Sequence, residues 1–171
     1  MLYGLMAMPS TFIQGRYMRK LIFETIIHSN IKAIWKIITD NEHYSWRSDI
    51  SEIKIIEPHH TFIEISKNGI QTVFIITAIK PYALYEFDME NKYFYGHWID
   101  HFHEHSEEKT KIFFTEILNI KNPIMKMFSY VFMNLKGMQK KYISDLIKEL
   151  SKEKTSNNRF KLKTGKIQLV T

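Results

Sequence analysis

Residues 122–150 read NPIMKMFSYVFMNLKGMQKKYISDLIKEL, and apolar side chains recur there every three or four positions. This spacing predicts one long amphipathic helix. Asn122 is a favourable N-cap, and Pro123 suits the first helical turn because its missing N–H would have no partner there. A helix of this length spans roughly 40 Å, so it needs an equally long apolar surface to pack against.

The candidate surface is a series of strand-like segments that comes before the helix. These segments are rich in β-branched and aromatic residues and are separated by turn residues. They cover residues 21–28, 50–56, 61–66, 70–79, 83–89, 94–104 and 111–120. Asn68-Gly69 predicts a hairpin with a type I′ turn, which needs a positive φ at both residues. The short links predict an antiparallel meander.

A short helix is predicted between the first two strands. Ser29 or Asn30 can cap it, and apolar positions follow at helical spacing until Asp40 and Asn41 break the pattern. Those positions are Ile31, Ile34, Trp35 and Ile38. A second turn or short helix through Tyr44 then leads to Trp46-Arg47-Ser48-Asp49.

Length and composition predict one folded domain. The chain has 171 residues, of which 44% are hydrophobic and 14% aromatic, which is typical of a globular protein. We expect the domain at residues 18–151, an N-terminal extension at 1–17 and a basic tail at 152–171. Cysteine is absent, which excludes disulfides and thiolate metal sites. Without a membrane-length apolar run or a basic signal-peptide region, we expect a cytoplasmic protein.

The positive charge is concentrated at the C-terminal end. Residues 121–171 hold 12 of the 24 Lys and Arg residues but three of the 18 Asp and Glu residues. Such a basic helix and tail could contact an anionic membrane or a protein partner. A solvated, solubilising surface is the reading we favour. Nucleic acid is not expected as a partner, because the basic residues do not alternate with aromatic stacking residues.

Two parts of the chain resemble a known family. The segment 26–55 contains Asn30-x4-Trp35-x2-Ile38-Thr39-Asp40 and then Trp46-Arg47-Ser48-Asp49-Ile50, and Lys109-Thr110-Lys111-Ile112, Glu116 and Asn122-Pro123 follow later. Residues 20–150 thereby resemble the polyketide cyclase/dehydrase-like branch of the START and Bet v 1 superfamily. The charged turn Ser106-Glu107-Glu108 stands where relatives often have glycine. The resemblance implies an α+β helix-grip fold, with a curved antiparallel sheet of six to seven strands around one long C-terminal helix.

The resemblance also implies a deep apolar cavity between the sheet and the long helix. The residues agree, because one helix cannot fill a strongly curved sheet along its whole length. Strand alternation predicts the lining residues on the sheet: Tyr85, Phe87, Met89, Trp98, Asp100, Phe102, Ile112, Phe114, Glu116 and Leu118. The predicted lining residues on the helix, around Gly137, are Val131, Leu135, Met138 and Tyr142. Trp46 and Arg47 are expected near the cavity mouth.

Asp100 and Glu116 are the candidate catalytic residues. Burial raises the pKa of a carboxyl group, so either could act as a general acid or base near neutral pH. The alternative, which we favour, is that hydrogen bonds satisfy both carboxylates and that they fix a ligand or the fold. Arg47 could clamp an anionic ligand group, but an ion pair with Asp49 or Glu52 is the favoured reading.

Histidines cluster on the strand at 94–104. His97, His101, His103 and His105 share one parity, and paired histidines on a strand can ligate a metal. Their face is opposite to that of Trp98 and Phe102, so we expect a solvated surface rather than a metal site. His101, His103 and His105 remain the weak metal candidates. The chain also lacks HExxH, Walker A, GxSxG and GxGxxG motifs, and we expect no cofactor.

The sequence therefore predicts a protein that binds a small hydrophobic or amphipathic molecule as a carrier, sensor or sequestering protein. The alternative is a metal-free cyclase or dehydratase in which Glu116 acts as acid or base and Tyr85 or Asp100 assists. A third reading is a membrane-surface or protein-partner module that acts through the basic C-terminal end. The oligomeric state stays open.

Overall fold

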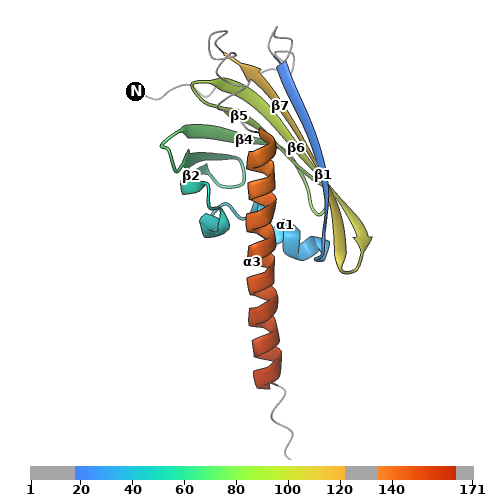
Figure 1. Ribbon diagram of the computed structural model, residues 1–171. Coiled ribbons are helices and arrows are strands. Elements are labelled where there is room, and N and C mark those ends of the chain that lie inside the picture. Colours follow the sequence, from blue (N-terminus) through green and yellow to red (C-terminus); the bar gives the residue numbers. More distant parts are fainter. Residues whose placement is uncertain (1–17, 122–134, 165–171) are drawn as a thin grey trace, which may run out of the picture.

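The computed structural model describes residues 18–121 and 135–164 (Figure 1). Within these residues, seven strands form one curved sheet, and α3 crosses in front of it. The strands are β1 (Met18–Ile27), β2 (Ile50–Glu57), β3 (Thr61–Ser66), β4 (Gln71–Lys80), β5 (Leu84–Glu90), β6 (Phe94–Ser106) and β7 (Lys109–Ile120). The helices are α1 (Ile31–Thr39), the short 3-10 helix η1 (Tyr44–Trp46) and α3 (Leu135–Thr164).

The sheet has the order β1-β7-β6-β5-β4-β3-β2, and every neighbouring pair is antiparallel. β2 to β7 thus form the predicted meander, and β1 adds to it beside β7. This is the helix-grip plan that the sequence predicted, with the curved sheet facing a C-terminal helix.

The turn between β3 and β4 differs from the prediction. Gly69 has a φ of 80°, but Asn68 is not among the residues with positive φ. The prediction of a type I′ turn is therefore wrong. Gly69 N–H donates to Ser66 O over 2.8 Å, and Ser66 N–H donates to Ile70 O over 2.9 Å. These bonds close a three-residue loop with glycine at its left-handed position, a common alternative hairpin.

The short helix α1 begins as predicted. Asn30 Oδ1 accepts a hydrogen bond of 2.9 Å from Ala33 N–H, which satisfies an unpaired donor of the first turn. One face of α1 buries Ile34, Ile37 and Ile38. η1 then turns the chain toward β2.

α3 extends further than the apolar pattern predicted. The helix was expected to end near Leu150 but continues to Thr164, and its C-terminal turns extend past the sheet and α1 (Figure 1). Much of the predicted tail is therefore helical. Polar contacts replace apolar packing in these turns: Lys152 pairs with Glu149 over 2.8 Å, and Lys36 of α1 pairs with Glu153 over 3.2 Å. The predicted start at Asn122-Pro123 lies outside the described residues.

The hydrophobic core has one cluster between α1, α3 and the adjoining end of the sheet. Its α3 members are Ile143, Leu146 and Leu150. Met138 and Ile147, which the periodicity placed in the same stripe, are 58% and 46% exposed. The core stripe of α3 is therefore narrower than predicted in this part of the helix.

Gly96 permits close packing on the inner face of the sheet. A Cβ atom at this position would lie 2.7 Å from Leu118 Cδ2 and 2.8 Å from Met89 Cγ and Cε. These three residues are register neighbours on β5, β6 and β7. A larger residue at position 96 would thus force two buried side chains apart. Within the described ranges, no helix is both long and apolar enough to cross a membrane.

Candidate functional site

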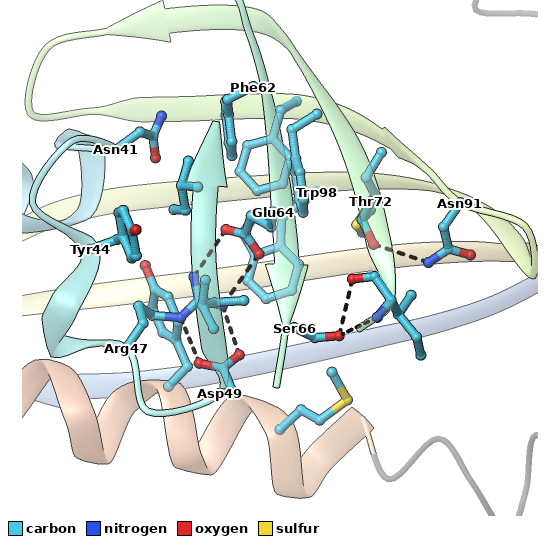
Figure 2. Close-up of a pocket in the computed structure, with 18 of the residues that line it drawn as sticks. Asn41, Tyr44, Arg47, Asp49, Phe62, Glu64, Ser66, Thr72, Asn91 and Trp98 are labelled. Atoms are coloured by element: carbon cyan, nitrogen blue, oxygen red, sulfur yellow. Dashed lines mark hydrogen bonds and ion pairs between the residues drawn. The ribbon is translucent and has the colours of Figure 1, made fainter. Parts of the chain in front are cut away.

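A cavity of about 630 Å³ lies between the concave face of the sheet, the η1 segment and the part of α3 around Met138. Large apolar side chains from the six strands β2 to β7 line much of its wall, and Figure 2 shows part of this lining. Phe62 and Phe74 are stacked with ring centroids 4.8 Å apart, and Phe87 and Trp98 are stacked at 6.0 Å. Aromatic rings therefore form a substantial part of the cavity lining.

The alternation of side chains along the strands directs these rings into the cavity. Phe62 on β3 is the register partner of Phe74 on β4, and Phe87 on β5 is the partner of Trp98 on β6. Tyr85, Phe87, Met89, Trp98, Asp100 and Glu116 all line the cavity, as do Trp46, Arg47, Met138 and Tyr142 from the other elements. Each was among the residues expected at the wall.

Four residues expected at the cavity wall lie in the packed core instead. Phe102, Ile112 and Phe114 belong to the cluster with α1 and α3, and Leu118 belongs to a second cluster with Phe62, Phe74 and Met89. Trp35 of α1 packs against Phe102 with ring centroids 5.2 Å apart. α1 thus helps to fill the end of the sheet that the alternation alone left open. Val131 and the side chain of Leu135 lie outside the described part of the chain.

Arg47 is held by two carboxylates at the cavity wall (Figure 2). Its Nε and Nη2 donate to Asp49 over 2.9 and 2.8 Å, and its Nη1 donates to Glu64 over 3.2 Å. The guanidinium also lies 4.9 Å from the ring centroid of Tyr142. The expected pair with Asp49 therefore forms, whereas Glu52 pairs with Lys54. The guanidinium is not left free to clamp an anionic ligand.

Glu64 is a cavity residue that the sequence analysis missed. It lies on β3 between Phe62 and Ser66, and all three line the cavity. Burial raises its pKa and outweighs the opposing effect of Arg47. The alternation of β3 could have identified Glu64 as inward-facing, but its ion-pair partner comes from the separate η1 segment.

Asp100 is fully enclosed beside Trp98. Trp98 Nε1 donates to Asp100 Oδ1 over 2.5 Å. Burial raises the pKa of Asp100 well above its ordinary value, although the bond from Trp98 acts in the other direction. Nearby, Asn41 Nδ2 donates to the Tyr85 hydroxyl over 3.3 Å, and burial raises the pKa of Tyr85 to about 12. Asp100 thus has the hydrogen-bond partner that the favoured alternative required.

Glu116 and Gln139 form a polar pair that joins β7 to α3. Gln139 Nε2 donates to Glu116 Oε2 over 3.2 Å. Both residues are buried, since Gln139 is 3% exposed and Glu116 is 7% exposed. Burial raises the pKa of Glu116 to about 7 despite this bond. Gln139 was missed because it lies between lysines and apolar residues on the helix, where periodicity carries no information about a polar partner.

The histidines of β6 do not gather around a common point. His97 contacts Asp88 over 2.7 Å and Glu86 over 3.2 Å, whereas His101, His103 and His105 are exposed. Among the residues that the structure describes, no three His, Asp or Glu side chains are arranged to hold a metal.

No protein-family model matches the chain, and no curated protein matches it in sequence. Solved structures do match in fold. The chain is similar to an aromatase/cyclase from Streptomyces sp. R1128, with a TM-score of 0.67 and 9% identity over 79% of this chain and 94% of that one. It is also similar to a START superfamily protein from Mycobacterium smegmatis, with a TM-score of 0.66 and 9% identity over 78% of this chain and 97% of that one.

A norcoclaurine synthase from Thalictrum flavum matches with a TM-score of 0.62 and 12% identity, over 80% of this chain and 96% of that one. Binding proteins and enzymes share this architecture, so the fold by itself does not separate binding from catalysis.

Proposed function

Because the chain has the helix-grip fold of the START and Bet v 1 superfamily, we propose that it binds one small, largely apolar molecule in the cavity between the sheet and α3. The molecule would be carried, sensed or sequestered. The observation that carries this proposal is the cavity of about 630 Å³ with its aromatic lining.

The cavity has the properties of a small-molecule site. Its volume falls within the range of about 300 to 1,000 Å³ that is common for such sites. Phe62, Phe74, Phe87 and Trp98 offer stacked rings, whose burial against an apolar ligand contributes roughly 25 cal/mol per Å² removed from water. Polar groups at the wall, such as the Arg47 cluster with Asp49 and Glu64 and the pair of Glu116 and Gln139, can orient a ligand between the apolar side chains.

Native mass spectrometry tests this proposal directly. Protein purified without denaturant should show a mass increment that disappears when the protein is unfolded, or should gain one when it is incubated with apolar molecules of matching volume. If the purified protein carries no occupant and takes up none of a chemically broad set of apolar molecules, the proposal is overturned.

A second candidate function is acid–base catalysis in the same cavity. The observation that favours it is the pKa of Glu116, which burial raises to about 7, because a general acid or base works best when its pKa lies near the operating pH. Under this proposal, Glu116 would transfer a proton to or from the bound molecule.

The enzyme proposal has a separate test. Once a bound molecule is identified, its conversion should be followed with the unmodified protein and with Glu116→Gln. Loss of turnover with retained binding in the variant would support the enzyme. Equal turnover in both proteins would eliminate Glu116 as the acid or base.

A further inference from the structure

Among the described residues at the cavity wall, the charged side chains are predominantly acidic, although the whole chain has a net charge of +6. The charged side chains among them are Asp40, Asp49, Glu64, Asp100, Glu116 and Arg47. Five are carboxylates and one is a guanidinium. The cavity therefore has the opposite charge balance to the rest of the chain.

Arg47 is already occupied by carboxylates. Asp49 receives hydrogen bonds from its Nε and Nη2, and Glu64 receives bonds of 3.2 and 3.5 Å from its Nη1 and Nη2. An anionic ligand group would therefore have to displace Asp49 or Glu64 from this guanidinium. Among the described residues of the wall, no other Lys or Arg is present to attract a negative charge.

Glu116 and Gln139 both line the cavity, and the pair contains a buried acceptor without a donor. Gln139 donates to Glu116 through Nε2, but within the described part of the chain its buried Oε1 has no hydrogen-bond partner. A buried acceptor without a donor is unfavourable. A donor that reaches this acceptor, next to a carboxyl group, would stabilise the pair.

An ammonium group meets this need better than a hydroxyl group. It supplies three donors, which can serve Gln139 Oε1 and Glu116 together, whereas a hydroxyl supplies one. Its bonds to a carboxylate are charge-assisted and stronger than neutral ones. Trp98 is the register partner of Glu116 across β6 and β7 and lines the same cavity, so its ring offers a surface that also favours a cation.

We propose that the ligand of this cavity is an apolar molecule that carries a protonated amine, and that the ammonium binds between Glu116 and Gln139. This inference rests on the proposed function and adds the chemical class of the ligand. The aromatic side of the cavity holds the apolar body, and the acidic wall selects its charged end.

Competition against a neutral fluorophore tests the ligand class. Nile red would be bound first, and then displaced at pH 7.5 by 4-phenylbutylamine, 4-phenylbutanol or 4-phenylbutyrate, which share one apolar body. The amine should displace Nile red at a concentration about tenfold lower than the alcohol, and the carboxylate should be the weakest. An alcohol or carboxylate that competes as well as the amine would overturn the inference.

The outcomes separate this inference from the proposed function. If Nile red binds saturably and the amine has no advantage, the cavity binds apolar molecules but does not select an ammonium. If neither Nile red nor any of the three compounds binds, the proposed function fails, and the ligand class fails with it.

Variants locate the ammonium. Glu116→Gln keeps the side-chain shape and removes the charge, so it should abolish the advantage of the amine and leave the affinity for the alcohol unchanged. Gln139→Met removes the unfilled acceptor and should weaken the binding of the amine alone.

Glu107→Gln is the control, because it removes the same charge from the exposed turn after β6, and it should keep the preference for the amine. Circular dichroism would verify folding, and a Glu116→Gln protein that still prefers the amine would overturn the assignment.

Discussion

Gln139 on α3 donates a hydrogen bond of 3.2 Å to Glu116 on β7, and this bond ties the long helix to the sheet at the cavity wall. Both side chains are buried. The bond favours the ionised carboxyl group, but burial has the larger effect and raises the pKa of Glu116 to about 7. The cavity thus holds a carboxyl group that changes its charge near neutral pH.

The stability of the protein should depend on the protonation of Glu116. Its pKa rises from 4.5 to about 7 on folding, so its contribution to stability is fully present below pH 4.5 and is lost as the pH rises through 7. Glu116→Gln should remove this pH-dependent loss of stability, which amounts to about 3 kcal/mol in the free energy of unfolding between pH 5 and pH 8. Urea denaturation at both pH values measures it. Equal pH dependence in the variant and the unmodified protein would contradict the raised pKa.

Loss of Arg47 should strongly destabilise the fold. Its side chain is 15% exposed and neutralises Asp49 and Glu64. Arg47→Met leaves these two carboxylates together without a cation, which should lower the free energy of unfolding by about 3 to 5 kcal/mol. Chemical denaturation checks the value. Lys54→Met is the control, because Lys54 forms an exposed pair with Glu52, and similar losses in both variants would argue against a special role for Arg47.

Gly96 should not tolerate a methyl group. Gly96→Ala places Cβ 2.7 Å from Leu118 Cδ2, and overpacking of this kind should cost about 1 to 3 kcal/mol. The double variant with Met89→Ala should lose less stability than the sum of the two single variants, because the shortened side chain makes room for the new methyl group. Thermal and urea unfolding of the two variants measure this. An unchanged stability in Gly96→Ala would show that Leu118 and Met89 move aside freely.

Ser48 should contribute to the attachment of α3. Its backbone N–H and its Oγ donate to Asp145 Oδ2 over 3.0 and 2.5 Å. Burial disfavours the carboxylate, but these bonds outweigh that effect and lower the pKa of Asp145. Ser48→Ala should cost about 1 to 3 kcal/mol and raise that pKa, which NMR titration can follow. Ser151→Ala, on the exposed side of α3, should have a smaller effect, and equal effects would contradict the role of Ser48.

The sheet was predictable because local patterns determine it. Thr61–Ser66 coincides with the predicted strand, and the other strands differ by a few residues at their ends. α3 was predicted too short because apolar periodicity stops at Leu150, whereas ion pairs and side-chain hydrogen bonds accompany the helix beyond it. The turn at Asn68-Gly69 was misassigned because the dipeptide fits two hairpin geometries.

The cavity was predictable only in part. Alternation placed Tyr85, Phe87 and Trp98 at the wall, since it follows from the strand alone. It could not show that α1 and α3 fill the space beside Phe102 and Phe114, which depends on how the helices dock. Gln139 was missed for the same reason, because its partner Glu116 belongs to a distant element. The alternation of β3 could have identified Glu64, and only its pairing with Arg47 depended on another element.

Uptake of an apolar molecule by the cavity can be tested by filling the cavity with a large side chain. Thr72 on β4 lines the cavity, and Thr77 on the same strand is exposed. Thr72→Trp and Thr77→Trp therefore make the same chemical change inside and outside the cavity.

The decisive measurement is a fluorescence titration of Nile red with the unmodified protein and both variants. We predict saturable binding of one Nile red per chain, retained in Thr77→Trp and weakened about tenfold or more in Thr72→Trp. Equal binding by all three folded proteins would show that the dye binds elsewhere and would contradict the claim.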